Sequence, residues 1–303
     1  MNRTIEKVIQ PSEFHMVGDG FRVHSFFPSN DIESSRMSPF VLLDYNPKFN
    51  FSPSVIQRWV GPHPHRWFET VTIAFHGSVS HHDSAGHSGT IFPGDVQWMT
   101  AGSGVLHKEY HEKAFSEKGW IFQMTQIWVN LPKKYKMTDP KYQAITLGQR
   151  WIYNFESNTG EVQVIAGEYK WVKWPASTFS PIGMYDIRLN EWWKVDLSFP
   201  KNYNVCLVVL DGDIQIEDVK IKEDSFVLFS NNAEDILIES IKKSTKTVLF
   251  FIDSIRKSTV LVLAWEPIGE PVVHYGPFVM NEESEIREAM DDFRGGKFGE
   301  LDG

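Results

Sequence analysis

Two pairs of residues with metal-binding side chains stand out in the first half of the chain, His63-x-His65 and His107-x-Glu109. On a β-strand, residues i and i+2 project from the same face of a sheet. Each pair therefore offers two donor side chains on one side of a sheet. The spacing predicts a four-ligand metal site, formed by two such strands that face each other.

The donor types restrict the metal without selecting one. Cys206 is the only cysteine of the chain, so a site rests on imidazole and carboxylate rather than on thiolate. Such donors suit one divalent Fe, Mn, Ni, Cu or Zn ion, and the order of affinities does not choose among them in a cell. Four protein ligands on an octahedral ion leave two positions open, as a bidentate substrate, or a substrate together with dioxygen, would need.

Three features near these pairs need an interpretation of their own. Glu69, four residues after His65, is either a fifth ligand or a group that orients an imidazole. Gly102 and Gly104 are expected to serve the backbone, through a positive φ or a close approach. A polar cluster surrounds a predicted hairpin turn, and we interpret its members as solvated turn residues rather than as a second metal site: His81, His82, Asp83 and His87.

The composition describes a folded, acidic protein. The 303 residues are 42% apolar and 14% aromatic, which supplies ample core for one large or two ordinary domains. The formal net charge of -9, with acidic residues spread along the chain, argues against nucleic-acid binding. The sequence shows neither an 18-residue apolar run nor a signal peptide. We therefore expect a cytoplasmic monomer that does not bind membranes.

Short apolar or β-branched runs alternate with turn residues in the first half of the chain, which predicts many short strands. Their near-even spacing indicates an antiparallel sandwich or barrel rather than βαβ units. The polar, basic segment 132–139 is interpreted as a linker, so the predicted domains are residues 1–135 and 136–303. Strands are expected at residues 21–27, 40–44, 70–75, 78–82, 89–92, 96–100 and 120–131.

The second half repeats this pattern without the candidate ligands. The segment around Gly212 resembles the segment around Gly77, which is a weak internal repeat consistent with duplication. Because residues 180–260 contain no histidine, a metal site is predicted in the first domain only. Strands are expected at residues 162–166, 185–189, 205–210, 213–217, 225–229, 236–241 and 247–252.

The C-terminal segment breaks the β pattern. Asn281 is the predicted N-cap of a helix with an acidic first turn, and Ile286, Met290 and Phe293 fall on one face of it. Ser284 stands three residues after this cap, so a full capping box is not expected. The predicted fold is therefore all-β, with a short amphipathic C-terminal helix docked on the sheets.

Several segments resemble the pirin family of the cupin superfamily. The spacings His63-x-His65-x3-Glu69 and Gly104-x2-His107 are similar to the two cupin motifs. A narrower similarity to pirins covers nearly the whole chain. Its segments are GDGFRV (18–23), HPHRWFETV (63–71), PGDVQWMTAG (93–102), QIWVNLP (126–132) and EPIGEPVVHYGPFVMN (266–281).

The resemblance implies a bicupin, in which two antiparallel β-barrels of jelly-roll type carry one mononuclear metal, usually Fe(II), in the N-terminal barrel. In pirins three histidines and one glutamate bind the metal, and these correspond to His63, His65, His107 and Glu109 in this sequence. The glutamate of the first motif, here Glu69, is not ordinarily a ligand in pirins.

One residue departs from the family pattern. Pirins usually have glycine after the His-Pro-His-Arg segment, where this chain has Trp67. On an ideal strand the indole would point toward the pocket and narrow it, which would hinder the entry of a flavonol, the substrate of some pirins. A bend near Pro64 would instead turn the indole away. Trp98 and Gln126 are expected, with Trp67 and Glu69, to line the pocket or to hold the ligands.

The resemblance implies two kinds of function. Some pirins open the flavonol quercetin with dioxygen, so one hypothesis is a quercetin 2,3-dioxygenase. The metal would bind the deprotonated flavonol hydroxyl, Glu109 would act as the base, and the central ring would be cleaved with loss of carbon monoxide. The alternative is a redox-responsive metal protein that docks on a protein partner. A third interpretation is that the metal binds adventitiously.

Overall fold

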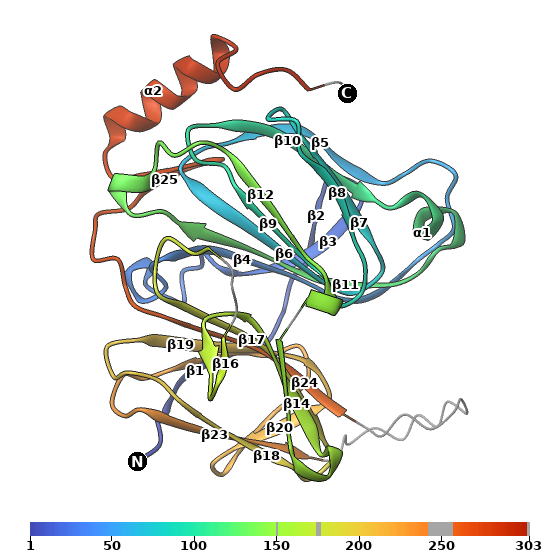
Figure 1. Cartoon of the computed structure of the whole chain (residues 1–303), viewed down its shortest axis with the longest axis vertical. Coiled ribbons are helices and arrows are strands. Elements are labelled where there is room, and N and C mark those ends of the chain that lie inside the picture. Colours follow the sequence, from blue (N-terminus) through green and yellow to red (C-terminus); the bar gives the residue numbers. More distant parts are fainter. Residues whose placement is uncertain (150, 174–176, 242–256, 302–303) are drawn as a thin grey trace. The chain divides into compact units, whose positions relative to one another are not determined.

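The computed structural model describes residues 1–149, 151–173, 177–241 and 257–301. Strands dominate it, and they form two compact units (Figure 1). The first barrel comprises Ser12–Gln149 with Ile268–Gly303, and the second barrel comprises Met1–Pro11 with Arg150–Pro267. The predicted all-β fold of two antiparallel domains with a short C-terminal helix is confirmed.

Two antiparallel sheets form the main part of the first barrel. The larger has the strand order β12-β9-β6-β11-β4-β3-β2, and the smaller has the order β5-β10-β7-β8. Their strands are β2 (His15–Val17), β3 (Phe21–Phe27), β4 (Phe40–Phe51), β5 (Trp59–His65), β6 (Phe68–His76), β7 (Val79–Asp83), β8 (Ser88–Ile91), β9 (Val96–Thr100), β10 (Val105–His111), β11 (Trp120–Asn130) and β12 (Lys141–Ile145). The other elements are α1 (Lys113–Lys118), β25 (Val273–Tyr275), β26 (Phe278–Met280), α2 (Glu283–Arg294) and the 3-10 turns η1 (Ser34–Arg36), η2 (Lys133–Tyr135) and η3 (Leu147–Gln149).

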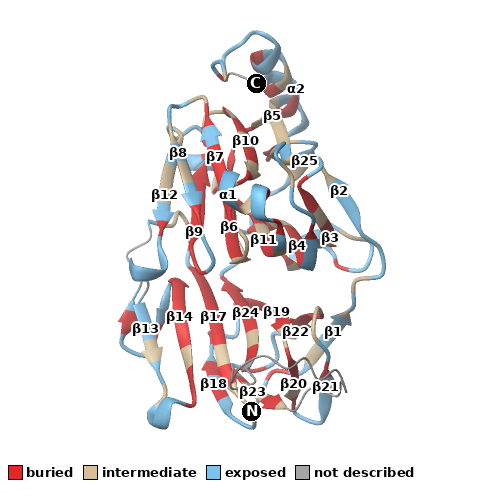
Figure 2. Cartoon of the chain, turned by 90° about the vertical axis from the view of Figure 1, so that its right-hand side faces the viewer, coloured by how far each residue is buried: buried red, intermediate tan, exposed pale blue. Residues whose placement is uncertain are grey.

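The second barrel repeats this division into a larger and a smaller sheet. The orders are β1-β22-β19-β24-β17-β14-β13 and β18-β23-β20-β21. Figure 2 shows long buried stretches in the central strands of the larger sheet, and side chains of both sheets contribute to one large apolar cluster. The predicted strand 247–252 lies outside the described residues. The elements are β1 (Ile5–Ile9), β13 (Trp151–Asn154), η4 (Glu156–Asn158), β14 (Gly160–Ala166), β15 (Glu168–Tyr169), β16 (Val172–Lys173), β17 (Ile182–Asn190), β18 (Lys194–Ser198), β19 (Asn204–Asp211), β20 (Asp213–Ile216), β21 (Val219–Ile221), β22 (Phe226–Phe229), β23 (Asp235–Ile241) and β24 (Lys257–Trp265).

The two units differ from the predicted division into 1–135 and 136–303 in three places: residues 1–11 belong to the second barrel, and residues 136–149 and 268–303 belong to the first. Strand β12, which follows the expected linker, pairs with β9 in the first barrel. At the N-terminus, β1 pairs with β22 in the second barrel. Pairing between segments far apart in the sequence decides both assignments, and a local pattern does not report it.

Among the described helices, none has the length and apolar character needed to cross a membrane.

The C-terminal helix begins one residue later than predicted. Its N-cap is Glu282 rather than Asn281. This shift places Glu285 three residues after the cap, where its carboxylate accepts a hydrogen bond from the Glu282 N–H at 3.0 Å. A capping box therefore exists, contrary to expectation. Ile286 and Ala289 are buried, so the helix does dock through an apolar face.

The turn between β9 and β10 depends on two glycines, as predicted. Gly102 has a φ of 49° and Gly104 a φ of 128°. A Cβ on Gly102 would lie 2.1 Å from the backbone oxygen of Thr138, and one on Gly104 would lie 2.6 Å from the ring of Phe298. Positive φ and close approach both require glycine here. The strand that carries His107 begins directly after this turn.

Trp67 lies in a bend between β5 and β6, with a φ of 77°. This bend breaks the alternation of side chains that an ideal strand would continue from His65. The indole is buried in a cluster with Phe278, Met280 and Ile286 of the C-terminal segment, and its Nε1–H donates to the sulfur of Met137 at 3.0 Å. Trp67 therefore anchors the C-terminal segment.

We expect Trp67→Ala to lower the free energy of unfolding by about 3–5 kcal/mol, because it removes a fully buried aromatic side chain. Denaturant unfolding measures this change. Phe92→Ala is the matched control, since Phe92 is 52% exposed and surface substitutions usually stay within about 0.5 kcal/mol. Equal effects of the two substitutions would contradict the anchoring role.

Candidate metal centre

The three candidate histidine ligands come together on two adjacent strands of the smaller sheet. Strand β5 pairs with β10, and His63 lies directly opposite His107. The ring centroids of His63 and His107 are 4.3 Å apart, and those of His65 and His107 are 4.7 Å apart. One donor atom from each of the three rings lies within 4.8 Å of the others. The pairs thus lie side by side in one sheet, not on two facing sheets.

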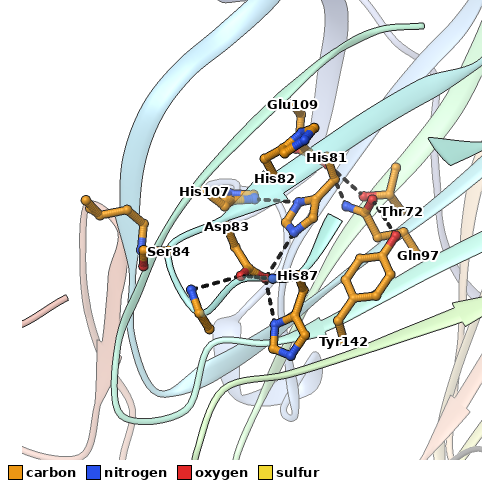
Figure 3. Close-up of polar contacts among 12 residues, drawn as sticks. Thr72, His81, His82, Asp83, Ser84, His87, Gln97, His107, Glu109 and Tyr142 are labelled. Carbon is orange, nitrogen blue, oxygen red and sulfur yellow. Dashed lines mark hydrogen bonds and ion pairs between the residues drawn. The ribbon is translucent and has the colours of Figure 1, made fainter. Parts of the chain in front are cut away.

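Glu109 extends this cluster along β10. With His81 and His107 it forms the second group of candidate ligands found among the described residues, again within 4.8 Å. Its carboxylate accepts hydrogen bonds from three side chains of the opposite sheet. Oε1 accepts from Thr72 at 3.2 Å and from Gln97 at 3.1 Å (Figure 3). Oε2 accepts from Gln126 at 2.7 Å.

These donors belong to a row of polar residues on the inner face of the larger sheet. Their strands lie in register, so the side chains stand next to one another on the same face. The sequence-based expectation included Gln126 and missed the other members, because which strands become neighbours is not visible in the local pattern. The row consists of Gln97, Thr72, Gln126, Asp44 and Ser25.

The ring nitrogens of the three histidines fit a metal ion. Nδ1 of His63 lies 2.8 Å from the carbonyl oxygen of Gly61 and donates to it, which leaves the lone pair on Nε2. Nδ1 of His65 and Nε2 of His107 are buried and find no hydrogen-bond partner among the described residues. Buried polar atoms are normally paired, so these unpaired nitrogens suit a divalent ion in their midst.

Burial keeps two of these imidazoles neutral. It lowers the pKa of His65 and of His107 well below the ordinary value, and the neighbouring His63 lowers both pKa values further. A neutral imidazole is the form that binds a metal ion. The two rings are therefore in the ligating state at neutral pH.

Glu69 and Trp98 face away from this cluster. Along β6, Thr72 points to Glu109, so Glu69, three positions earlier, projects from the opposite face. Trp98 likewise alternates with Gln97 on β9. The expectation for Glu69 assumed that side chains alternate without interruption from His65 onward, and the bend at Trp67 interrupts this alternation. The Glu69 carboxylate instead accepts a hydrogen bond from Thr100 at 2.8 Å.

His81 and Asp83 are not solvated turn residues, and that interpretation is wrong. Both are buried on the inner face of β7, directly opposite Glu109 and His107 of β10. Their spacing, i and i+2, is the one that identified the two ligand pairs, so the signal was present in the sequence. The turn itself follows at residue 84, where it was expected, and His81 and Asp83 precede it on the strand.

The cluster opens toward an aromatic wall. The rings of Phe68 and Trp128 stack with centroids 4.4 Å apart, and Trp128 lies edge-on to His65 at 4.9 Å. Trp128, Gln126 and His63 are each only partly buried. The histidine cluster is therefore bordered by Trp128, an aromatic side chain that is partly exposed.

The buried carboxyl group of Glu69 should make the stability of the folded protein depend on pH. Burial raises its pKa from 4.5 to about 7, although the hydrogen bond from Thr100 opposes the rise. Because the folded state disfavours the ionised form, this residue should cost stability as pH rises from about 4.5 to about 7, by roughly 3 kcal/mol in total. Glu69→Gln should therefore gain stability relative to wild type over that range.

Urea unfolding of wild type and Glu69→Gln at pH 4.5 and pH 8 measures the effect. The control is Glu117→Gln, which removes an exposed carboxylate from α1 and should change stability little at either pH. A difference between wild type and Glu69→Gln that is the same at both pH values would refute the prediction.

Comparison with known proteins yields matches over both barrels. The family profile described as Pirin matches residues 20–129, and the profile of the Pirin C-terminal cupin domain matches residues 184–299. A Pseudomonas aeruginosa protein that bears the provisional name quercetin 2,3-dioxygenase is 41% identical, over 94% of this chain and 94% of its own.

Solved structures agree with these matches. The crystal structure of quercetin 2,3-dioxygenase from Acinetobacter baumannii has a TM-score of 0.89 and 41% identity, and the match covers 100% of both chains. The bacterial pirin YhhW from Escherichia coli, solved in complex with nickel(II), has a TM-score of 0.61 over 86% of this chain and 99% of its own. At 17% identity this second likeness concerns the fold alone. The chain with its two cupin barrels belongs to the pirin family.

Proposed function

We propose that this protein oxidises a flavonol with dioxygen, as a quercetin 2,3-dioxygenase, at one divalent metal ion held by His63, His65, His107 and Glu109. The observation that supports the proposal is that His63, His65 and His107 bring ligand atoms within 4.8 Å of one another, and that Glu109 shares a second such group with His107. The match over the full chain to a structure named quercetin 2,3-dioxygenase supports the reaction type. Fe(II) is our first choice of metal, with Ni, Mn, Cu and Zn as the other candidates.

The ion would act as a Lewis acid that stabilises the charge of the deprotonated flavonol and brings the two reactants together. The protein supplies the base. Glu109 can take the proton of the flavonol hydroxyl, while Thr72, Gln97 and Gln126 hold its carboxylate in place through three hydrogen bonds.

The aromatic wall suits the shape of the proposed substrate. A flavonol is planar, and the partly exposed face of Trp128 beside His65 offers a surface for stacking.

The metal site itself can be tested without substrate. Elemental analysis of protein purified without added metal should find close to one divalent ion per chain in wild type and almost none in His107→Ala, which loses the histidine shared by both ligand groups. His82→Ala is the control, because His82 is exposed on the same sheet. Equal metal content in wild type and His107→Ala would indicate adventitious binding.

The reaction is tested by loading the metal-free protein with Fe(II), Ni(II) or Mn(II) and following the absorbance of quercetin under air. At least one loaded form should consume the flavonol and release carbon monoxide, and the metal-free protein should not. Gln126→Leu should lower the rate by about 10-fold or more, because it removes the shortest hydrogen bond to the carboxylate. Inactivity of all three loaded forms would exclude the proposed reaction.

A further inference from the structure

A chain of polar side chains leads away from His107 across the smaller sheet. In the register of β10 and β7, His81 stands opposite Glu109, and Asp83 stands opposite His107. All four side chains are buried. Figure 3 shows His81 between His107 and Asp83, with His87 on the far side of the carboxylate.

The distances define a continuous path. Nδ1 of His107 lies 3.4 Å from Nδ1 of His81, and Nε2 of His81 lies 3.2 Å from Oδ2 of Asp83. Asp83 is itself held firmly. Its Oδ1 accepts from the backbone N–H groups of Ala85 at 3.0 Å and His87 at 2.9 Å, and its Oδ2 lies 3.1 Å from Nδ1 of His87.

The proton positions follow from what each group can donate. An ionised carboxylate only accepts, so the proton of His81 is assigned to Nε2, which faces Asp83. Nδ1 of a neutral His81 then carries a lone pair and accepts, so the proton of His107 is assigned to its own Nδ1. This leaves the lone pair of His107 on Nε2, the buried atom that has no partner among the described residues.

We propose that His81 and Asp83 are positioning residues, which fix the ring orientation and the tautomer of His107 so that its Nε2 is presented to the metal ion. Metal-binding histidines commonly donate their second ring N–H to a carboxylate or a carbonyl group. Here the imidazole of His81 stands between His107 and the carboxylate of Asp83. The inference rests on the proposed metal site and is independent of the flavonol reaction.

Two other roles for His81 need to be distinguished from this one. Its ring stacks on Tyr142, with centroids 5.1 Å apart and an angle of 18° between the planes, so it could act by packing alone. It also belongs to the ligand group of His107 and Glu109, so it could bind the metal directly. Substitutions and nuclear magnetic resonance separate these roles.

The first experiment measures zinc affinity by competition with a chromophoric chelator, in protein freed of metal. His81→Phe keeps a ring against Tyr142 and removes both nitrogens. Asp83→Asn keeps the shape, but its NH2 group faces Nε2 of His81, which moves the His81 proton to Nδ1, against the N–H of His107. Each variant should bind Zn²⁺ about 10–100-fold more weakly than wild type.

His82→Gln is the matched control. His82 lies on the same strand but is exposed on its other face, where Nδ1 is 2.8 Å from the hydroxyl of Tyr110, so its zinc affinity should equal that of wild type. Unchanged affinity in both His81→Phe and Asp83→Asn would overturn the proposal. An equal loss of zinc affinity in His82→Gln would also overturn it. Thermal unfolding of the metal-free proteins checks that each variant is folded.

The second experiment needs no variant. Long-range proton–nitrogen correlation spectra of the zinc-loaded wild-type protein should show protons on Nδ1 of His107 and Nε2 of His81, and no zinc coordination by His81. Zinc bound to a His81 nitrogen, or a proton on Nε2 of His107, would overturn the assignment. Because both readouts are of zinc binding, a failure of the flavonol reaction leaves them unaffected.

Discussion

A buried polar group costs free energy unless it is paired, and this constraint governs the interior of the first barrel. Histidines and a carboxylate from the smaller sheet meet amide and hydroxyl groups from the larger one. Glu109 is the meeting point, because its two oxygens accept hydrogen bonds from three strands of the opposite sheet. Ring nitrogens of His65 and His107 are among the buried atoms that find no partner in the described residues, and these nitrogens suit a metal ion.

The second barrel has the same two-sheet plan and a different interior. Its described core is a continuous apolar cluster, so side chains fill the space that the first barrel leaves to polar chemistry. The comparison separates the fold from the site: the strand orders correspond, but only the first barrel contains the candidate ligands found among the described residues. A shared architecture therefore implies nothing about metal binding until the inward side chains are known.

The C-terminal segment completes the first barrel around the ligand strand β5. The guanidinium of Arg66, next to His65, donates to the Ser103 carbonyl at 2.7 Å and to the Asp292 carboxylate at 2.9 Å. Trp67 packs against the same segment. The residues that immediately follow the His-x-His pair are thus used for anchoring, and the Trp67 indole packs among apolar side chains of the C-terminal segment.

The sequence by itself determined the features that depend on local alternation. The i, i+2 spacing placed His63 with His65 and His107 with Glu109, and the absence of histidine from 180–260 restricted the candidate site to one barrel. The same rule applied to β7 would have found His81 and Asp83. Only the tertiary structure decided what lies beyond one strand, namely which strands are neighbours, which donors hold Glu109, and in which barrel the chain ends reside. The reason is physical. The alternation of side chains between the two faces holds only within one strand, and the bend at Trp67 interrupts it before Glu69. Strand pairing joins segments that are far apart in the sequence, and no local pattern connects them.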